Sequence, residues 1–231
     1  MLKADFHMHT KYSINKDCDT PLETIIDRCQ KLGINCIAIT DHGTAEGALQ
    51  MAKIAPFKVI VGEEVLTPNG EIIGLFLKET IPSGISVEEA VAKIKAQGGL
   101  VCLPHPFDPL RGLRMSKESL AKLAGQADII EVFNARGPFA GPVKKANALA
   151  LKYNLPGSAG SDAHYPYELG HTYIEMPDFN GKEEFLQALR KGVIHKQRAS
   201  LIIYVRVTWA RLVRALTRNK RVGPPDKRTH S

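Results

Sequence analysis

Five short clusters of histidine and acidic residues occur in this 231-residue sequence, and each of them follows an apolar run. The clusters are His7-Met8-His9, Asp41-His42, Glu63-Glu64, His105-Pro106 and Ser161-Asp162-Ala163-His164. Imidazole nitrogens and carboxylate oxygens together are ligands of zinc, manganese and iron. If these side chains meet in the folded chain, they form a site for divalent metal ions.

The elements that precede the clusters must bring them together. The apolar runs read as buried strands, at Leu2–Phe6, Cys36–Thr40, Val59–Gly62, Leu100–Pro104 and Gly157–Gly160. Parallel strands end at one rim of a sheet or barrel, and the catalytic groups of α/β folds gather at that rim. Residues two apart on a strand share a face, so His7 and His9 point the same way, as do Asp162 and His164.

Helical patterns separate these strands. The first predicted helix has Thr20 as its N-cap, runs to about Leu32 and ends at Gly33. A turn signal at 68–70 predicts that residues 71–77 return as a hairpin partner of the preceding strand. Strands that alternate with helices of about ten residues indicate βαβ units. The sequence therefore predicts an α/β fold, and a small or distorted barrel rather than an open sheet.

The net charge of +7 is concentrated at one end of the chain. Residues 196–231 hold ten Lys and Arg and one acidic residue, Asp226, whereas residues 1–195 carry 21 Lys and Arg against 23 Asp and Glu. Apolar residues three and four apart, with arginines on another face, predict a basic amphipathic helix within 196–220, and 221–231 read as a disordered tail. That helix could dock on the barrel, touch an anionic membrane or bind nucleic acid. We expect the catalytic domain over 1–195.

Composition limits the cellular setting. No apolar run approaches the roughly 18–20 residues of a membrane span and no secretory signal is present, so we expect no stable membrane insertion. The cysteines lack a CxxC pair and read as thiols of a reducing compartment, Cys36 and Cys102 as buried ones, which predicts a cytoplasmic protein. The sequence does not define an oligomeric state.

In this order the clusters resemble the PHP (polymerase and histidinol phosphatase) family of metal-dependent phosphoesterases. The resemblance rests on the stretches 5–10, 39–42, 62–65, 103–106 and 160–164 and extends to about residue 195. It implies a distorted (β/α)7 barrel, similar to a TIM barrel, with two or three divalent ions (Zn, Mn or Fe) in its mouth. It also implies an enzyme that hydrolyses phosphoric esters.

The resemblance assigns ligands residue by residue. One ion is expected on His7, His9, Glu64 and Asp162, with Glu64 rather than Glu63 bridging to a second ion. The second ion is expected on His105. Glu71 follows Gly70 where the family often has a histidine, and it is a candidate for this ion, with a solvated turn residue as the alternative.

A third ion is expected on His42, His164 and a residue in the loop after His9. The family places that residue where this chain has Asn15, and a two-residue insertion would bring Asp17 into register. We expect Asp17, with Asn15 and Asp19 as the competing positions. Asp41 lies beside His42 and His164 in the group expected to be catalytic, where it would orient a ligand or the attacking water.

Phosphate recognition requires cations or N–H donors beyond the metal ions. Arg111 and Arg114 follow the His105 strand end, and Asn134 and Arg136 follow the strand 129–133. We expect one of the three arginines to contact phosphate, and Asn134 to polarise a substrate hydroxyl.

These residues predict a metal-dependent phosphoesterase that attacks a small phosphorylated substrate, of the nucleotide or nucleoside bisphosphate class, with metal-activated water. The alternatives are a 5′–3′ exonuclease on short nucleic acid and a phosphatase similar to histidinol phosphatase. A non-catalytic metal-binding module is less favoured, because every expected ligand cluster is intact. A metal-dependent amidohydrolase would require a lysine among the clusters, and none is present.

Overall fold

The strands follow one another around a curved sheet. The computed structural model describes residues 1–198, which form one compact unit. Residues 199–231, and with them most of the predicted basic helix and all of the predicted tail, lie outside the described residues. The strands are β1 (Leu2–Met8), β2 (Cys36–Ile39), β3 (Lys58–Thr67), β4 (Gly70–Leu75), β5 (Leu100–Leu103), β6 (Ile129–Asn134), β7 (Gly157–Gly160), β8 (Tyr173–Met176) and β9 (Val193–His195).

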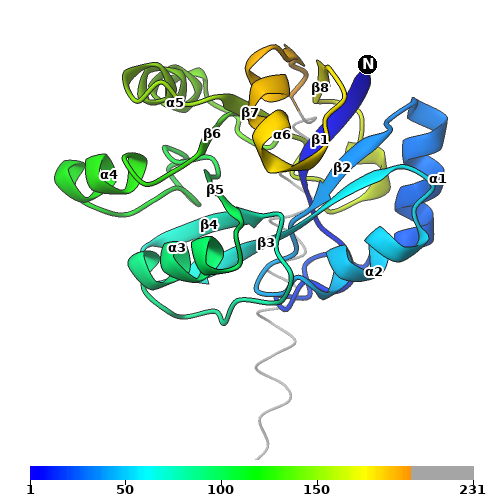
Figure 1. The fold of residues 1–231 in the computed structure, drawn as a ribbon, viewed down its shortest axis with the longest axis horizontal. Helices are drawn as coiled ribbons and strands as arrows, with labels where there is room; N and C mark the ends of the chain where they lie inside the picture. Colours follow the sequence, from blue (N-terminus) through cyan, green and yellow to red (C-terminus); the bar gives the residue numbers. More distant parts are fainter. Residues whose placement is uncertain (199–231) are drawn as a thin grey trace, which may run out of the picture. The chain divides into compact units, whose positions relative to one another are not determined.

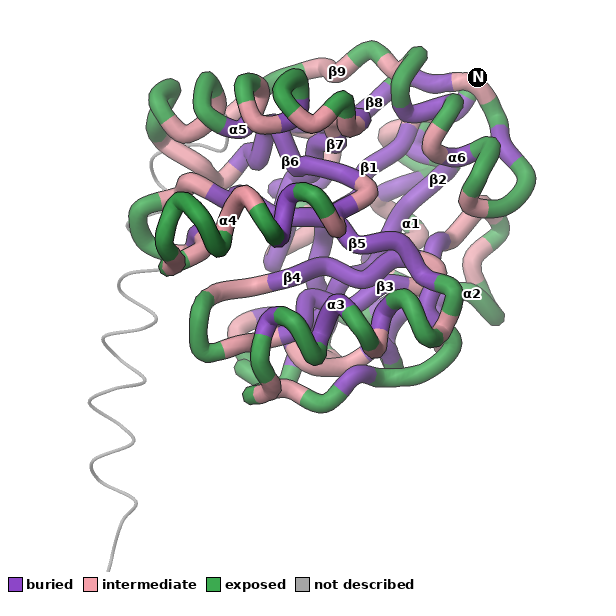
Figure 2. The backbone as a smooth tube through the Cα atoms, turned by 60° about the vertical axis from the view of Figure 1, so that its left-hand side comes forward, coloured by how far each residue is buried: buried purple, intermediate pink, exposed green. Residues whose placement is uncertain are grey.

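Helices flank this sheet on its outside (Figure 1). They are α1 (Leu22–Leu32), α2 (Glu46–Ile54), α3 (Val87–Ala96), α4 (Lys117–Ala124), α5 (Ala140–Lys152) and α6 (Gly181–Arg190), with a short 3-10 turn at Pro166–Glu168. In α3 the buried residues Val87, Ala90, Val91 and Ile94 recur three and four apart, so one face packs on the sheet. Figure 2 shows the same pattern throughout, with exposed outer faces on the helices and buried strands between them.

The order of strands is β7-β6-β5-β4-β3-β2-β1-β8-β9. The pairs β1–β2, β2–β3, β5–β6 and β6–β7 are parallel, whereas β4 is antiparallel to both β3 and β5. The hairpin predicted for 71–77 is thereby confirmed. Because β4 runs in the opposite direction, Glu71 at its start lies at the rim where the parallel strands end.

The sheet closes nearly into a barrel where β1 meets the end of β7. The amide of Asp162 donates to His7 O (2.7 Å), and the amide of His9 donates to Ala163 O (2.9 Å). Gly160 permits this approach, because a Cβ at that position would overlap His7. The predicted distorted α/β barrel is confirmed, and strands β8 and β9 extend it beyond β1.

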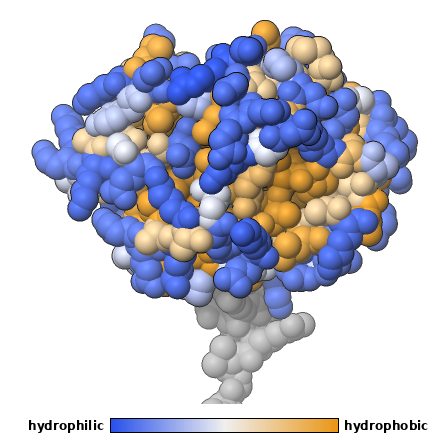
Figure 3. Space-filling view, viewed as in Figure 1, coloured by the Kyte–Doolittle hydropathy of each residue, from blue (hydrophilic) through white to orange (hydrophobic). Residues whose placement is uncertain are grey.

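The barrel interior divides into an apolar end and a polar end. Ile60, Ile73 and Ile129 belong to one apolar cluster, together with Phe185 from α6. Two or four residues along the same strands, on the same faces, lie acidic residues at the opposite end, namely Glu64, Glu71 and Glu131. The period of two along each strand therefore supplies both the core and the carboxylates of the rim. Seen from one side, hydrophilic residues cover most of the periphery and hydrophobic ones gather towards the middle (Figure 3).

Two local expectations differ from the structure. Thr20 is not the N-cap of α1: Pro21 occupies that position, and the Thr20 hydroxyl donates instead to His164 O (3.0 Å). Gly33 does end the helix, in the left-handed conformation (φ 68°). Strand β9 was not predicted, because three residues are too short a run to carry a periodic signal.

Within residues 1–198, none of the helices is long and apolar enough to cross a bilayer.

Candidate metal centre

The first group of donor atoms comes from β1, β3 and the loop after β7. Glu64 Oε2 lies 3.5 Å from His7 Nε2 and 3.6 Å from His9 Nε2. Asp162 Oδ1 lies 3.7 Å and 3.2 Å from the same two nitrogens. Ligands about 2.0–2.2 Å from a tetrahedral ion lie roughly 3.3–3.6 Å apart. The four atoms therefore have the spacing of a coordination shell.

A second group uses the other oxygen of Glu64. His105 Nε2 lies 3.2 Å from Glu64 Oε1 and 3.5 Å from Glu71 Oε2. The two oxygens of Glu64 therefore face different sets of donors, so the carboxylate can bridge them. Its side chain is almost fully buried. Glu71 is no solvated turn residue, because its side chain is only 19% exposed and faces His105.

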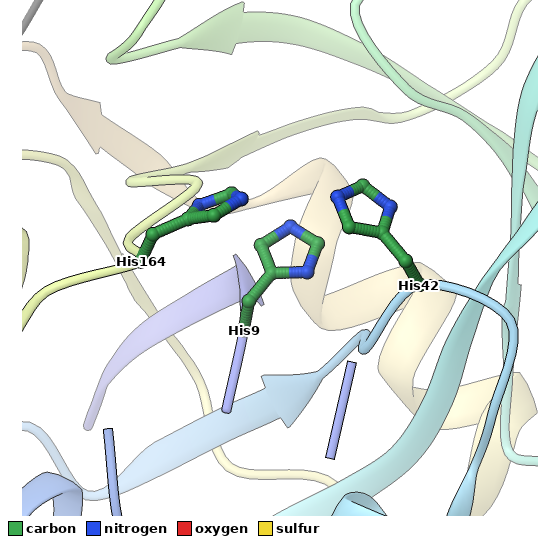
Figure 4. A group of neighbouring side chains, drawn as sticks. All are labelled: His9, His42 and His164. Atoms are coloured by element: carbon green, nitrogen blue, oxygen red, sulfur yellow. The ribbon is translucent and has the colours of Figure 1, made fainter. Parts of the chain in front are cut away.

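The third group contains Asp17, from the loop after β1. Asp17 Oδ2 lies 3.4 Å from His42 Nε2 and 3.4 Å from His164 Nε2. Asn15 and Asp19 are exposed, so Asp17 is the member of that loop that meets the two imidazoles. Figure 4 shows His42 and His164 on either side of His9. Their ring centroids lie 4.3 and 4.2 Å from that of His9.

Several donor atoms in these groups form no hydrogen bond within residues 1–198. They are buried, and the unpaired ones include His7 Nε2, both ring nitrogens of His9, Glu64 Oε2 and Glu71 Oε2. Buried polar atoms are almost always hydrogen-bonded, and a convergent unpaired set of nitrogen and oxygen atoms fits divalent cations. The structure brings together all nine residues expected as ligands: His7, His9, Asp17, His42, Glu64, Glu71, His105, Asp162 and His164. Their assignment as ligands remains a prediction.

The histidines and carboxylates of the centre shift one another's pKa, and His9 and Glu64 are held in the forms that bind cations. Burial and the nearby His164 and His42 lower the pKa of His9 well below its usual value, so its ring is neutral. Burial alone would raise the pKa of Glu64, but His7 and His42 hold it well below the usual range. Burial and the Glu64 carboxylate raise the pKa of Glu71 to about 7. Neutral imidazole and ionised carboxylate are the forms that ligate metals.

Glu131 on β6 bonds to two of the expected ligands, His7 and His105, and the sequence did not predict this role. Its Oε1 lies 2.9 Å from His7 Nδ1, and its Oε2 accepts from the His105 amide (2.8 Å). A carboxylate on the far nitrogen of a ligating histidine fixes the ring and its tautomer. The available signal was an acidic residue inside the apolar run Ile129–Phe133, which is costly to bury without partners.

Two further acidic residues, Asp5 and Glu168, were given no role from the sequence, and they hold the backbone around the donors. Glu168 Oε2 accepts from the His164 amide (2.6 Å) and the Tyr165 amide (2.9 Å). Asp5 Oδ1 accepts from the Ser161 amide (3.0 Å). Burial raises the pKa of Asp5 to about 7, against the hydrogen bonds from Ser161 and His7. Glu168 ends the short 3-10 turn Pro166–Glu168, and no sequence signal distinguished it.

The hydrogen bonds of Asp41 run to the loop after β1, and its expected role beside His42 and His164 stays a prediction. Its Oδ1 accepts from the Thr10 amide (2.5 Å) and the Ser13 hydroxyl (3.0 Å), and its Oδ2 accepts from the Thr10 hydroxyl (2.6 Å). Both oxygens are occupied, and the residue is fully buried. Asp41 therefore fixes the start of the loop that carries Asp17, because Thr10 and Ser13 lie in that loop.

Asn134 bonds to two carboxylates and one backbone amide of the centre. Its amide nitrogen donates to Glu131 Oε2 (3.1 Å) and Asp162 Oδ2 (3.2 Å), and its oxygen accepts from the Arg136 amide (3.0 Å). Through these bonds Asn134 positions Asp162, and its expected action on a substrate hydroxyl stays a prediction.

Two expected ligands have backbone conformations that L residues rarely adopt. His105 has φ 27° and Asp162 has φ 53°. His105 is therefore not extended, although prolines flank it on both sides. Such conformations cost roughly 1–3 kcal/mol each and persist where surrounding contacts enforce them. For His105 the enforcing contact is the bond from its amide to Glu131.

Two of the three candidate arginines lie beside the centre, and the third does not. Arg111 pairs with Asp162 Oδ2 and with Asp108 Oδ2 (3.0 Å), and Arg136 lies 2.9 Å from His164 Nδ1 and 3.4 Å from Glu168. Both guanidinium groups border the donor atoms. Arg114 is exposed and donates to Leu110 O (3.4 Å) in its own loop, so it does not reach the centre.

Comparison with known proteins places this architecture in a family. Residues 5–80 match the PHP domain and residues 142–194 match the PHP-associated segment. An uncharacterised protein of Methanocaldococcus jannaschii is 35% identical over 200 residues, which covers 82% of this chain and 79% of that protein.

Solved structures agree on the fold. A two-domain protein of Bacteroides vulgatus, described as containing a PHP-like metal-dependent phosphoesterase, superposes with a TM-score of 0.68 at 21% identity. The match covers 85% of this chain but 65% of that one, slightly less than two thirds of its length. Endonuclease Q, solved with a 27-mer duplex that carries an abasic lesion, superposes with a TM-score of 0.63 at 19% identity, over 82% of this chain and 56% of that one. This chain belongs to the PHP family of metal-dependent phosphoesterases.

Proposed function

We propose that this protein hydrolyses a small phosphate ester, of the nucleotide or nucleoside bisphosphate class, with water as the nucleophile. The observation that carries the proposal is the convergence of three donor groups at one rim, with the Glu64 carboxylate between the first two. We assign two or three Zn, Mn or Fe ions to these groups. Bound there, such ions would polarise a phosphoryl oxygen and lower the pKa of a water molecule.

The chain's own residues supply binding and orientation. Arg111 and Arg136 present guanidinium N–H groups beside Asp162 and His164. A phosphoryl group at the rim would therefore meet cationic donors as well as the ions, and guanidinium geometry suits phosphate. Glu131 holds His7 and His105 in place, so the donor set is organised before substrate arrives.

A metal-reconstitution assay tests this proposal. The protein is stripped, loaded separately with Zn, Mn and Fe, and screened against phosphorylated metabolites and short oligonucleotides, with bound metal counted by mass spectrometry. We expect release of inorganic phosphate from at least one small monoester, and none from the Glu64→Gln variant. Loaded protein that holds two or three ions yet hydrolyses no ester would support a non-catalytic metal-binding module instead.

Short nucleic acid is the second candidate substrate. It is supported by the structural similarity to endonuclease Q, whose structure contains a DNA duplex. A 5′-labelled oligonucleotide in the same screen distinguishes the two, because an exonuclease releases nucleotides whereas a small-molecule phosphatase leaves the chain intact. A phosphatase similar to histidinol phosphatase is tested by histidinol phosphate in that screen. We also propose a cytoplasmic location, which the four free and buried cysteines support.

A further inference from the structure

The loop between β1 and α1 carries Asp17, and its two halves are fastened to different segments of the barrel rim. The first half is fastened to the segment that follows β2. The Thr10 amide donates to Asp41 Oδ1 (2.5 Å). The Ile14 amide donates to His42 O (3.0 Å). The first half of the loop is therefore bonded to the segment that supplies one of the two imidazoles facing Asp17.

The second half of the loop is fastened to the segment that follows β7. The Cys18 thiol donates to His164 O (3.0 Å) and lies 3.3 Å from His9 O. The Thr20 hydroxyl donates to the same His164 carbonyl (3.0 Å). Both side chains are buried. Two side-chain donors thus converge on the backbone of His164, which supplies the other imidazole facing the loop.

Asp17 lies between these two attachments. Its Oδ2 is 3.4 Å from His42 Nε2 and 3.4 Å from His164 Nε2, so it meets one imidazole from each segment. Cys18 is the next residue in the chain, so its thiol holds the backbone beside this carboxylate. A donor that is already held loses less freedom when an ion binds.

The hydroxyl of Thr20 serves this attachment instead of the helix that follows. A threonine at an N-cap stabilises a helix by accepting a hydrogen bond from the first turn. Helix α1 has Pro21 as its N-cap and no side-chain hydrogen bond there. The polar group that could have capped the helix is directed to the His164 carbonyl. Its contact therefore points to a role at the centre.

We propose that Cys18 and Thr20 are positioning residues for the third donor group. By holding the backbone of His164 against the loop, they fix the distance between its imidazole and Asp17. The affinity for a third ion then depends on these two side chains, whereas the affinities of the first two donor groups do not. This inference rests on the proposed function, because that proposal assigns an ion to the third group.

Removing both donors tests the proposal. Thr20→Val keeps the shape of the side chain and removes its hydroxyl, and Cys18→Ala removes the thiol. Manganese is titrated into the stripped double variant, and the two-ion and three-ion forms are counted by native mass spectrometry. We expect the third ion to bind about tenfold more weakly, with the first two unchanged, because two buried hydrogen bonds are lost. An unchanged third ion, or equal weakening of all three, overturns the inference.

A conservative variant and a matched control separate positioning from general stability. Cys18→Ser with Thr20→Ser keeps a hydroxyl at both positions, and it should restore most of the affinity for the third ion. Cys29→Ala removes another buried thiol, from α1, and should leave the third ion unchanged even if it lowers stability. The inference fails if the serine variant is as weak as the double variant, or if Cys29→Ala weakens the third ion equally.

Hydrogen exchange in the stripped protein separates this inference from the proposed function. The Lys11 amide donates to Thr20 O (3.0 Å) and reports closure of the loop, whereas the His9 amide donates to Ala163 O (2.9 Å) and reports closure of the barrel. We expect the double variant to speed exchange at Lys11 and not at His9. That pattern supports the attachment even if no ester is hydrolysed.

Unchanged exchange at Lys11 rejects the inference whether or not the enzyme is active. If the double variant does not fold, Thr20→Val alone decides by the same criteria, because it preserves the side-chain volume.

Discussion

Two parts of the metal centre are built differently. His7, His9, Glu64 and Asp162 are at most 2% exposed, and they lie on strands or on a segment hydrogen-bonded to β1. Asp17 comes from a loop, and its side chain is 26% exposed. The first part is fixed by the same hydrogen bonds that close the barrel. The second depends on a loop that Asp41 ties down through Thr10 and Ser13.

This difference indicates which part of the site is rigid before any ion binds. A donor held by a strand loses little freedom when it binds, whereas a loop donor must be ordered at a cost in free energy. We therefore expect the first group to hold its ion more tightly than the third. Substitutions in the first part should therefore reduce activity more than substitutions in the second part.

The largest effect is expected from Asp162→Asn. Asparagine tolerates the positive φ of this position, so the backbone is preserved and one anionic donor is removed. Activity should fall about 10³-fold or more, because the ion supplies several kcal/mol of charge stabilisation. Steady-state phosphate release and metal counting check this. Asp178→Asn, exposed and remote, is the control, and a loss of less than tenfold would contradict a role for Asp162 in the first group.

Glu131→Gln should produce the next largest effect. The amide keeps the shape but loses the charge that orients His7 and supports His105, and changes to such partners typically cost about 10–100-fold in metal affinity or activity. Metal titration of the stripped variant measures the affinity. We expect saturating metal to restore the ion count, whereas Asp162→Asn should stay deficient. An affinity equal to that of the original protein would show that Glu131 does not orient the centre.

Asp17→Asn tests the loop part directly. We expect about a tenfold loss of activity and one ion fewer, with the ions of the first two groups retained, since their donors do not involve the loop. Asp19→Asn, exposed in the same loop, should change neither number. Loss of all ions in Asp17→Asn would mean that the two parts of the centre do not form independently.

The smallest effect is expected at Arg114. Arg114→Ala should change kcat/KM by less than about twofold, because the exposed guanidinium bonds only its own loop. Arg111→Ala, three residues away, removes the cation paired with Asp162 and should cost about tenfold or more. Equal losses in the two variants would erase the distinction between the buried and exposed parts of this loop.

The sequence allowed the barrel and the composition of the donor set to be predicted, because both depend on local patterns. Apolar runs followed by His, Asp or Glu predicted strand ends, and the turn before Glu71 predicted the hairpin. Glu131 was not found, since one acidic residue in an apolar strand does not reveal which imidazole it contacts. Asn134 and Asp41 were expected at the centre, but no local pattern revealed their hydrogen bonds to Asp162, Thr10 and Ser13.

The sequence by itself determined which residue types stand at the ends of the strands. The period of two along a strand and the common direction of the parallel strands bring those ends to one rim. Only the tertiary structure decided that Asp17 rather than Asn15 or Asp19 meets His42 and His164, and that the two oxygens of Glu64 face different donor groups. The reason is physical: each choice depends on hydrogen bonds and packing between segments that are distant in sequence, and no local pattern records them.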